Sequence, residues 1–149
     1  MLTVVNKLLN IVSPTNAYFG KKDAQQLNLI SLMVKQLFMN VNIVAVDTKR
    51  DSDGLAMSSR NVYLSKEQRV EALKISKSLQ VAFGMVNSGH LQTKEIIQKM
   101  KDTLSGLEIF YVAIVNRDFE EIKTIEIRNT IVLVEVKVGT TRLLDNIWL

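Results

Sequence analysis

Apolar positions in the first fifty residues follow two different spacings. Positions 4, 5, 8, 9 and 12 lie on one face of a helix, which Pro14 ends because proline restricts the residue before it. A helical spacing returns over residues 23–39, whereas the short apolar runs 17–19 and 41–46 are typical of strands, the second of them buried. This order predicts an α/β unit in which a crossover helix joins two parallel strands.

The pattern changes after residue 64. Ser65 begins a helical pattern that extends to about residue 86, and Gln68 stands at the spacing of a capping box. Thr93 is expected to cap a second helix that ends near residue 105. Three β-rich runs follow, residues 107–115, 122–127 and 130–138, with Arg128-Asn129 as a tight hairpin turn and residues 142–146 as a short tail.

These patterns predict three parts. Residues 1–50 form an α/β unit, residues 51–64 form a polar, flexible hinge loop, and residues 65–149 form an α+β unit. The last unit should contain two helices and a three-stranded antiparallel sheet. A loop at a hinge between two units is a common position for a ligand site.

The composition excludes several classes of protein and of site. With 47% hydrophobic and 23% charged residues among 149, the chain is not disordered, and with no cysteine it has no disulfide, thiolate metal site or Cys nucleophile. The net charge of +4 is spread along the chain without the basic block of a nucleic-acid arm. No apolar stretch is long enough to span a membrane, and the first residues make a poor signal peptide. A cytoplasmic protein that binds neither nucleic acid nor membrane is expected.

The first candidate site follows the strand at residues 17–19. Gly20 allows close approach of a ligand to the backbone, and Lys21 or Lys22 could supply a charge to a phosphate. Asp23 could accept from ribose hydroxyls or help to hold Mg²⁺, and Gln26 could reach a polar substrate group. The alternative is an ordinary capped helix with its lysines in water.

The second candidate site lies in the hinge loop. Ser58 and Ser59 can donate to phosphate oxygens, and Arg60 can bind them bidentately. The alternative is a polar turn. Two such loops after successive strands favour nucleotide binding, although the spacing of a P-loop is absent. His90 is the only histidine and has no second ligand beside it, so no metal site is expected.

Three stretches together resemble one family. They are residues 20–26 (GKKDAQQ), residues 53–61 (DGLAMSSRN) and residues 139–146 (GTTRLLDN). Their sequences and spacing are similar to the pantothenate synthetase, or pantoate–β-alanine ligase, family over essentially the whole chain. The resemblance implies the end of a Rossmann-like parallel sheet, of the HIGH/KMSKS nucleotidylyl-transferase type, followed by a small carboxy-terminal α+β domain.

The resemblance also implies residue roles. Met57 to Arg60 would form the KMSKS-type loop on ATP, and Gln26 would bind pantoate. The full ATP-binding set would be Gly20, Lys21, Lys22, Asp23, Lys49, Met57, Ser58, Ser59 and Arg60, with Lys22, Ser58, Ser59 and Arg60 catalytic and no metal ligand among the side chains. Lys22 would contact the phosphates, Asp23 the ribose side, and the Lys49 backbone the adenine.

The implied reaction is an ATP-dependent, AMP-forming condensation of pantoate with β-alanine. Pantoate would first react with ATP and Mg²⁺ to give pantoyl-adenylate and pyrophosphate, and β-alanine would then displace AMP. Positioning and charge neutralisation suit this chemistry better than a covalent nucleophile. The resemblance also implies that the full-length protein forms a homodimer.

Two departures from the family qualify these expectations. The histidine motif of the family's amino-terminal half is not in the sequence, so the chain resembles the carboxy-terminal half, with residues 1–50 a remnant of the Rossmann-like domain. Alone it should be weakly active or inactive and should associate; the alternative function is a non-catalytic nucleotide-binding or self-associating fragment. Asp47 stands where the family usually has proline and is expected to loosen the strand exit.

Overall fold

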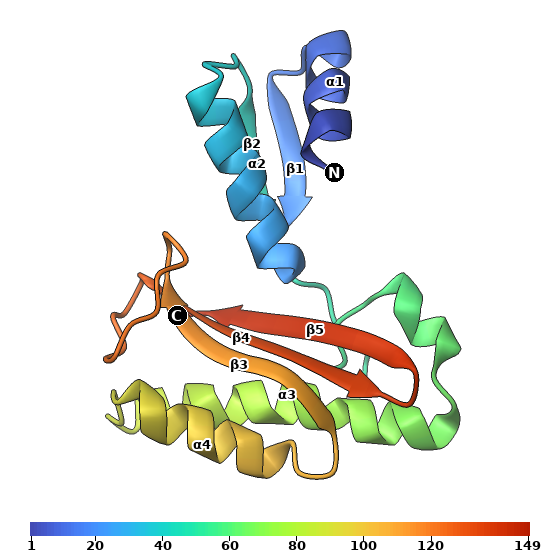
Figure 1. Cartoon of the computed structure of the whole chain (residues 1–149), viewed down its shortest axis with the longest axis vertical. Coiled ribbons are helices and arrows are strands. Elements are labelled where there is room, and N and C mark those ends of the chain that lie inside the picture. The colour runs from blue at the N-terminus through green and yellow to red at the C-terminus, as the bar shows by residue number, and fades with distance from the viewer. The chain divides into compact units, whose positions relative to one another are not determined.

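The computed structural model describes all 149 residues and divides into two compact units, Met1–Thr48 and Lys49–Leu149. Figure 1 shows the helices and strands of both. The division falls between Thr48 and Lys49, so residues 49–64, which contain the hinge loop expected at 51–64, fold with the second unit.

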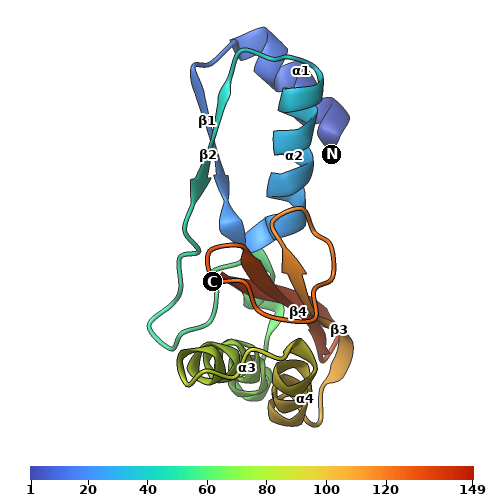
Figure 2. The same cartoon turned by 90° about the vertical axis from the view of Figure 1, so that its left-hand side faces the viewer.

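The first unit has the expected α/β order. Its elements are α1 (Leu2–Val12), β1 (Asn16–Gly20), a 3₁₀ turn (Lys21–Asp23), α2 (Ala24–Gln36) and β2 (Asn42–Val46). β1 and β2 pair in parallel, with Asn16 opposite Asn42 and Gly20 opposite Val46, and α2 is the crossover between them (Figure 2). The helix ends at Gln36, earlier than residue 39, and Phe38 adopts a left-handed φ of 50°.

Strand β2 is less buried than its apolar sequence predicts. None of its five residues is fully buried, and Val46 is exposed. The reason is that its sheet has only two strands. The buried apolar residues of the unit lie on the helices and are Leu9, Ala24, Leu27, Ile30 and Val34.

The second unit contains a helix pair and a three-stranded antiparallel sheet, as expected. The helices are α3 (Lys66–Asn87) and α4 (Thr93–Thr103), and the strands are β3 (Glu108–Asn116), β4 (Thr130–Val138) and β5 (Thr141–Trp148), in the order β3-β4-β5. Figure 1 shows both helices along one face of the sheet. Ile75, Leu79, Ile96, Met100, Val132, Val134 and Val136 are among the core residues between them.

The third strand of that sheet is not the one predicted. Residues 122–127 form no strand and make only an isolated bridge, between Thr124 and Gln92, whereas the predicted tail at 142–146 lies inside β5. Arg128 is in a turn with φ of 69°, but that turn ends the long connection from β3 to β4 and is not a tight hairpin turn. The apolar pattern did not predict β5 as a strand because two of its buried residues, Asp145 and Asn146, are polar.

The predicted caps of the two helices had different outcomes. Ser65 and Gln68 form the complete capping box at the start of α3. The prediction for Thr93 was wrong, because Gln92 is the N-cap and has no side-chain capping bond. The Thr93 hydroxyl instead donates to the carbonyl oxygens of Ile122 and Lys123, which fastens that segment to α4.

Candidate functional site

The first group of predicted site residues comes together where β1 ends. Gly20 is the last residue of β1, Lys21–Asp23 make the 3₁₀ turn, and Gln26 is exposed near the start of α2. Gly20 has an ordinary φ of −73°, and a Cβ atom added there would meet nothing within 4 Å. The fold of this unit therefore does not require a glycine at this position.

Charged side chains surround this turn. Lys21 Nζ lies 2.6 Å from Asp47 Oδ1, and Lys22 Nζ lies 3.6 Å from Asp23 Oδ1. Asp23 is the N-cap residue of α2, but its side chain makes no capping hydrogen bond. Asp23 therefore does not cap the helix through a hydrogen bond, whereas the alternative of an acidic residue in the first turn, placed for the helix dipole, stays open.

Asp47, which was expected to loosen the strand exit, makes an ion pair there. Its exposed carboxylate, at the end of β2, pairs with Lys21 at the end of β1. Because both strands are parallel, this ion pair joins their carboxyl ends. An exposed pair of this kind contributes little stability, so its main effect is on where Lys21 points.

The second group lies on a hairpin that was expected to be a flexible loop. The Met57 N–H donates to the Lys49 carbonyl at 2.9 Å, Arg50 bridges Ala56, and the Asp51 N–H donates to Leu55 at 2.8 Å. Leu55 and Ala56 are buried. Residues 51–57, which were predicted to be part of a flexible loop, therefore belong to a hydrogen-bonded hairpin of residues 49–57, in which Lys49 and Met57 are neighbours.

The hairpin presents the hydroxyl groups and the arginine at its end. Ser58 precedes the 3₁₀ helix Ser59–Tyr63, and its hydroxyl accepts from the Arg60 N–H at 3.2 Å. The Ser59 and Arg60 side chains are exposed and make no hydrogen bond or ion pair within the protein. Asn61 Nδ2 donates to the Ala56 carbonyl at 3.0 Å and ties this segment to the hairpin.

Residues that sequence reasoning did not select fasten the hairpin. Arg69 on α3 binds Asp53 and Asp51, and Arg50 binds Asp145 on β5. The hydrogen bond from Arg69, followed by that from the Leu55 N–H, lowers the pKa of Asp53 below its ordinary value. No local pattern marks Arg69, whereas Asp145 lies in the third family-like stretch and could have been singled out there.

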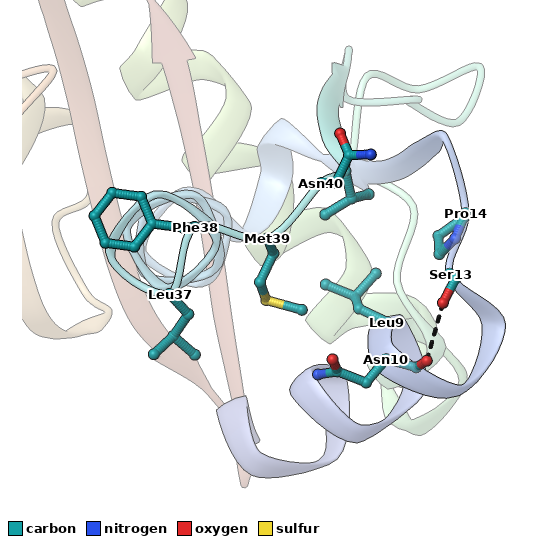
Figure 3. A pocket seen from close by; sticks show the side chains of 9 residues that line it. Leu9, Asn10, Ser13, Pro14, Leu37, Phe38, Met39 and Asn40 are labelled. Atoms are coloured by element: carbon teal, nitrogen blue, oxygen red, sulfur yellow. Dashed lines mark hydrogen bonds between the residues drawn. The ribbon is translucent and has the colours of Figure 1, made fainter.

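One hollow in the first unit is separate from these groups. It has a volume of about 430 Å³ and lies between the ends of α1 and α2; Figure 3 shows the lining residues, among them Leu9, Asn10, Ser13, Phe38 and Met39. Ser13 Oγ donates to the Asn10 carbonyl there. Since Ser13 precedes β1, the hollow is at the opposite end of the strand from Gly20.

The structure was also searched for groups of metal-ligating side chains and for helices that could span a membrane. No three His, Cys, Asp or Glu side chains are grouped so that they could hold a metal ion. His90 is exposed and its one ion-pair candidate is Glu95, 3.8 Å away. None of the helices combines the length and the apolar surface needed to cross a membrane.

Comparison with known proteins gives a consistent result. A family model described as pantoate-beta-alanine ligase matches residues 1–148. The pantothenate synthetase of Sulfurimonas denitrificans is 66% identical over all 149 residues, which cover 55% of its length. The chain therefore spans about half the length of the curated relatives it matches.

Solved structures agree with this match. A crystal structure of pantothenate synthetase from Thermus thermophilus superimposes with a TM-score of 0.93 at 34% identity, covering 99% of this chain and 54% of that one. A Francisella tularensis pantoate-beta-alanine ligase, complexed with beta-gamma ATP and beta-alanine, has a TM-score of 0.70 at 32% identity and covers 99% and 48%.

Proposed function

Because this chain belongs to the pantoate–β-alanine ligase family, we propose that it serves in the ATP-dependent, AMP-forming condensation of pantoate with β-alanine. The chain covers 55% of the Sulfurimonas relative, so the proposal concerns its action within a protein of full family length. Following the family resemblance, we include a homodimeric enzyme in the cytoplasm in the same proposal.

The observation that carries the proposal is the fastened hairpin with free phosphate-binding groups at its end. Ser59 and Arg60 are exposed without internal partners, whereas the backbone that holds them is hydrogen-bonded and anchored to α3 and β5. A guanidinium can bind two phosphate oxygens at once through its planar, preorganised pair of N–H donors. In our proposal Met57, Ser58, Ser59 and Arg60 bind the ATP phosphates, and the Lys49 backbone contacts the adenine.

The group at the end of β1 is proposed to bind ATP and pantoate. Gly20 leaves room for a ligand against the backbone. Following the resemblance, we assign Lys22 to the phosphates, Asp23 to the ribose, and Lys21 to the ATP site as a further positive charge. Gln26, exposed one turn into α2, is proposed to bind pantoate. The Asp23 carboxylate makes no capping bond and lies 3.6 Å from Lys22 Nζ, which supports a shared role of the two side chains at one ligand.

The proposed chemistry is the one that the family resemblance implies. An oxygen of the pantoate carboxylate attacks the α-phosphorus, the bond from that phosphorus to the bridging oxygen breaks, and pyrophosphate leaves with the electron pair. The β-alanine amine then attacks the acyl carbon, AMP leaves, and the amine loses its proton to solvent. Lys22, Ser58, Ser59 and Arg60 stabilise the negative charge that builds up during the first step.

Mg²⁺ fits this site as an ion carried by ATP. Asp23 is the one carboxylate in the candidate set, and magnesium in nucleotide sites is commonly held by one or two carboxylates together with phosphates and water. Bound there, the ion would neutralise phosphate charge.

A second function has one observation in its favour. Many apolar side chains of the first unit are exposed, including Leu8, Ile11, Val12, Leu37 and Phe38. Exposed apolar patches mark interaction surfaces. The alternative is a non-catalytic fragment that binds nucleotide or associates with itself.

A chimera tests the proposal. This chain replaces the matching 149 residues of the Sulfurimonas relative, and the purified protein is given ATP, Mg²⁺, pantoate and β-alanine. We expect pantothenate and AMP in equal amounts, and a loss of at least 100-fold in kcat/KM on changing Ser59→Ala with Arg60→Ala. Ser105→Ala, at an exposed serine outside the site, is the control. An inactive chimera that is folded, or ADP as the product, would contradict the proposal.

A further inference from the structure

A partly buried ion pair joins the start of the hairpin at residues 49–57 to the last strand of the protein. Arg50 Nη1 lies 2.5 Å from Asp145 Oδ2, and Arg50 Nη2 lies 3.1 Å from Asp145 Oδ1. The Asp145 side chain is only 2% exposed, and Arg50 is 30% exposed. The two residues are 95 positions apart in the sequence, so the contact is purely tertiary.

Further hydrogen bonds fix the geometry of the Arg50–Asp145 pair. Arg50 Nη1 also donates to the Gly54 carbonyl at 3.2 Å, across the hairpin turn. Asp145 Oδ1 also accepts from the Asn146 N–H at 2.8 Å. Arg50 is thus fixed in a two-pronged geometry, and removing either partner would leave a charge in a poorly solvated position.

The position of Arg50 links the pair to the phosphate-binding groups. Arg50 follows Lys49, whose carbonyl accepts the Met57 N–H, and it bridges Ala56 on the opposite side of the hairpin. Fixing the Arg50 side chain therefore fixes both sides of the hairpin just before Met57. Asp145 is itself held in the sheet, paired with Val134 of β4.

We propose that Asp145 is a positioning residue that acts through Arg50 to hold the hairpin, and with it Ser59 and Arg60, in the geometry that the reaction requires. The effect on catalysis rests on the proposed function; the effect on the hairpin does not. A displacement of about 1 Å in a positioning element can cost on the order of 100-fold in rate. The buried pair fixes the base of the hairpin, while the more exposed Arg69 contacts fix its turn.

Hydrogen exchange on the full 149-residue chain tests the positioning directly. Asp145→Asn keeps the size of the side chain but removes its charge. We expect roughly tenfold or faster exchange of the Asp51 and Met57 amides, with the β3–β4 amides unchanged. Glu135→Gln, which breaks the Arg142–Glu135 pair on the same sheet, is the matched control and should leave the hairpin amides unchanged. Unchanged exchange at Met57 in Asp145→Asn, or equal acceleration throughout the sheet, would overturn the proposal.

The chimera then tests the catalytic consequence. At a temperature well below unfolding, Asp145→Asn should lower kcat for pyrophosphate release roughly 10- to 100-fold and leave the KM for β-alanine unchanged. A purely structural role would lower the unfolding temperature and leave both constants intact, which would contradict the positioning role. An unsubstituted chimera without activity would refute the proposed function, while the exchange result would still decide whether Asp145 positions the hairpin.

Discussion

Arg69 holds Asp53 and Asp51 at the same time: its Nε lies 2.7 Å from Asp53 and its Nη2 lies 2.8 Å from Asp51. One side chain of α3 thereby fixes both acidic residues around the hairpin turn. The same contacts raise the pKa of the Arg69 guanidinium and lower that of the Asp53 carboxyl. The hairpin that carries Ser59 and Arg60 is therefore held by charge from a helix as well as by its own backbone.

Asp53→Asn should make the thermal stability of the protein less dependent on pH. The folded-state pKa of Asp53 is below its ordinary value, so the stabilisation is present above about pH 4 and is lost as the pH falls through the folded pKa. Thermal unfolding should begin at a lower temperature in Asp53→Asn at pH 7, and the difference from the unsubstituted chain should shrink as the pH is lowered from about 4 to 2. Asp118→Asn, at an exposed carboxylate without an ion pair, is the control. An equal difference at both pH values would contradict the assignment.

Gly20→Ala should separate binding from stability. Alanine fits the Gly20 backbone and meets no atom of the protein, so stability should rise by about 0.4–1 kcal/mol. A methyl group facing the ATP should nevertheless weaken its binding roughly tenfold or more, about 1.4 kcal/mol.

Gly84→Ala is the matched control for this glycine. Gly84 lies within α3, where an added Cβ also meets nothing within 4 Å. It should stabilise the chain by about 0.5–1 kcal/mol without changing ATP affinity. Equal ATP affinity in Gly20→Ala and Gly84→Ala chimeras would show that no ligand approaches Gly20.

Gly139→Ala should be coupled to Gln68. Gly139 has a φ of 58°, and a Cβ there would overlap the Gln68 amide, with the Gln68 Cδ at 2.8 Å. The strain costs about 1–2 kcal/mol, and displacing Gln68 also breaks the capping box of α3. In a double-mutant cycle from urea unfolding, Gly139→Ala should cost about 1 kcal/mol less when Gln68 is already alanine. Simple additivity would refute the contact.

Much of the fold could be predicted because local patterns agreed with tertiary packing. The crossover between β1 and β2 and the capping box at Ser65 follow from spacing and from local hydrogen bonds. β5 was missed because Asp145 and Asn146 are polar residues buried in a strand, and a pattern of apolar residues cannot register them. The pairing of Asp145 with a residue 95 positions away makes that burial possible, and no local signal encodes it.

In the candidate site, too, local features could be predicted and long-range contacts could not. The stretches around Gly20 and Ser58 carry local chemistry and could be selected from the sequence alone. The order of the hairpin could not, because it depends on Arg69 and Asp145, which come from distant elements. The proposed roles of Lys22, Asp23, Gln26 and Arg60 in binding remain predictions.

Calorimetric titration of Mg²⁺-ATP into the chimera and into its Ser59→Ala, Arg60→Ala variant measures phosphate binding by the hairpin without any turnover. We expect measurable binding that weakens roughly tenfold or more in the double variant and is unchanged in Ser105→Ala. Equal affinity in the chimera and the double variant would contradict the claim that Ser59 and Arg60 bind the phosphates of ATP.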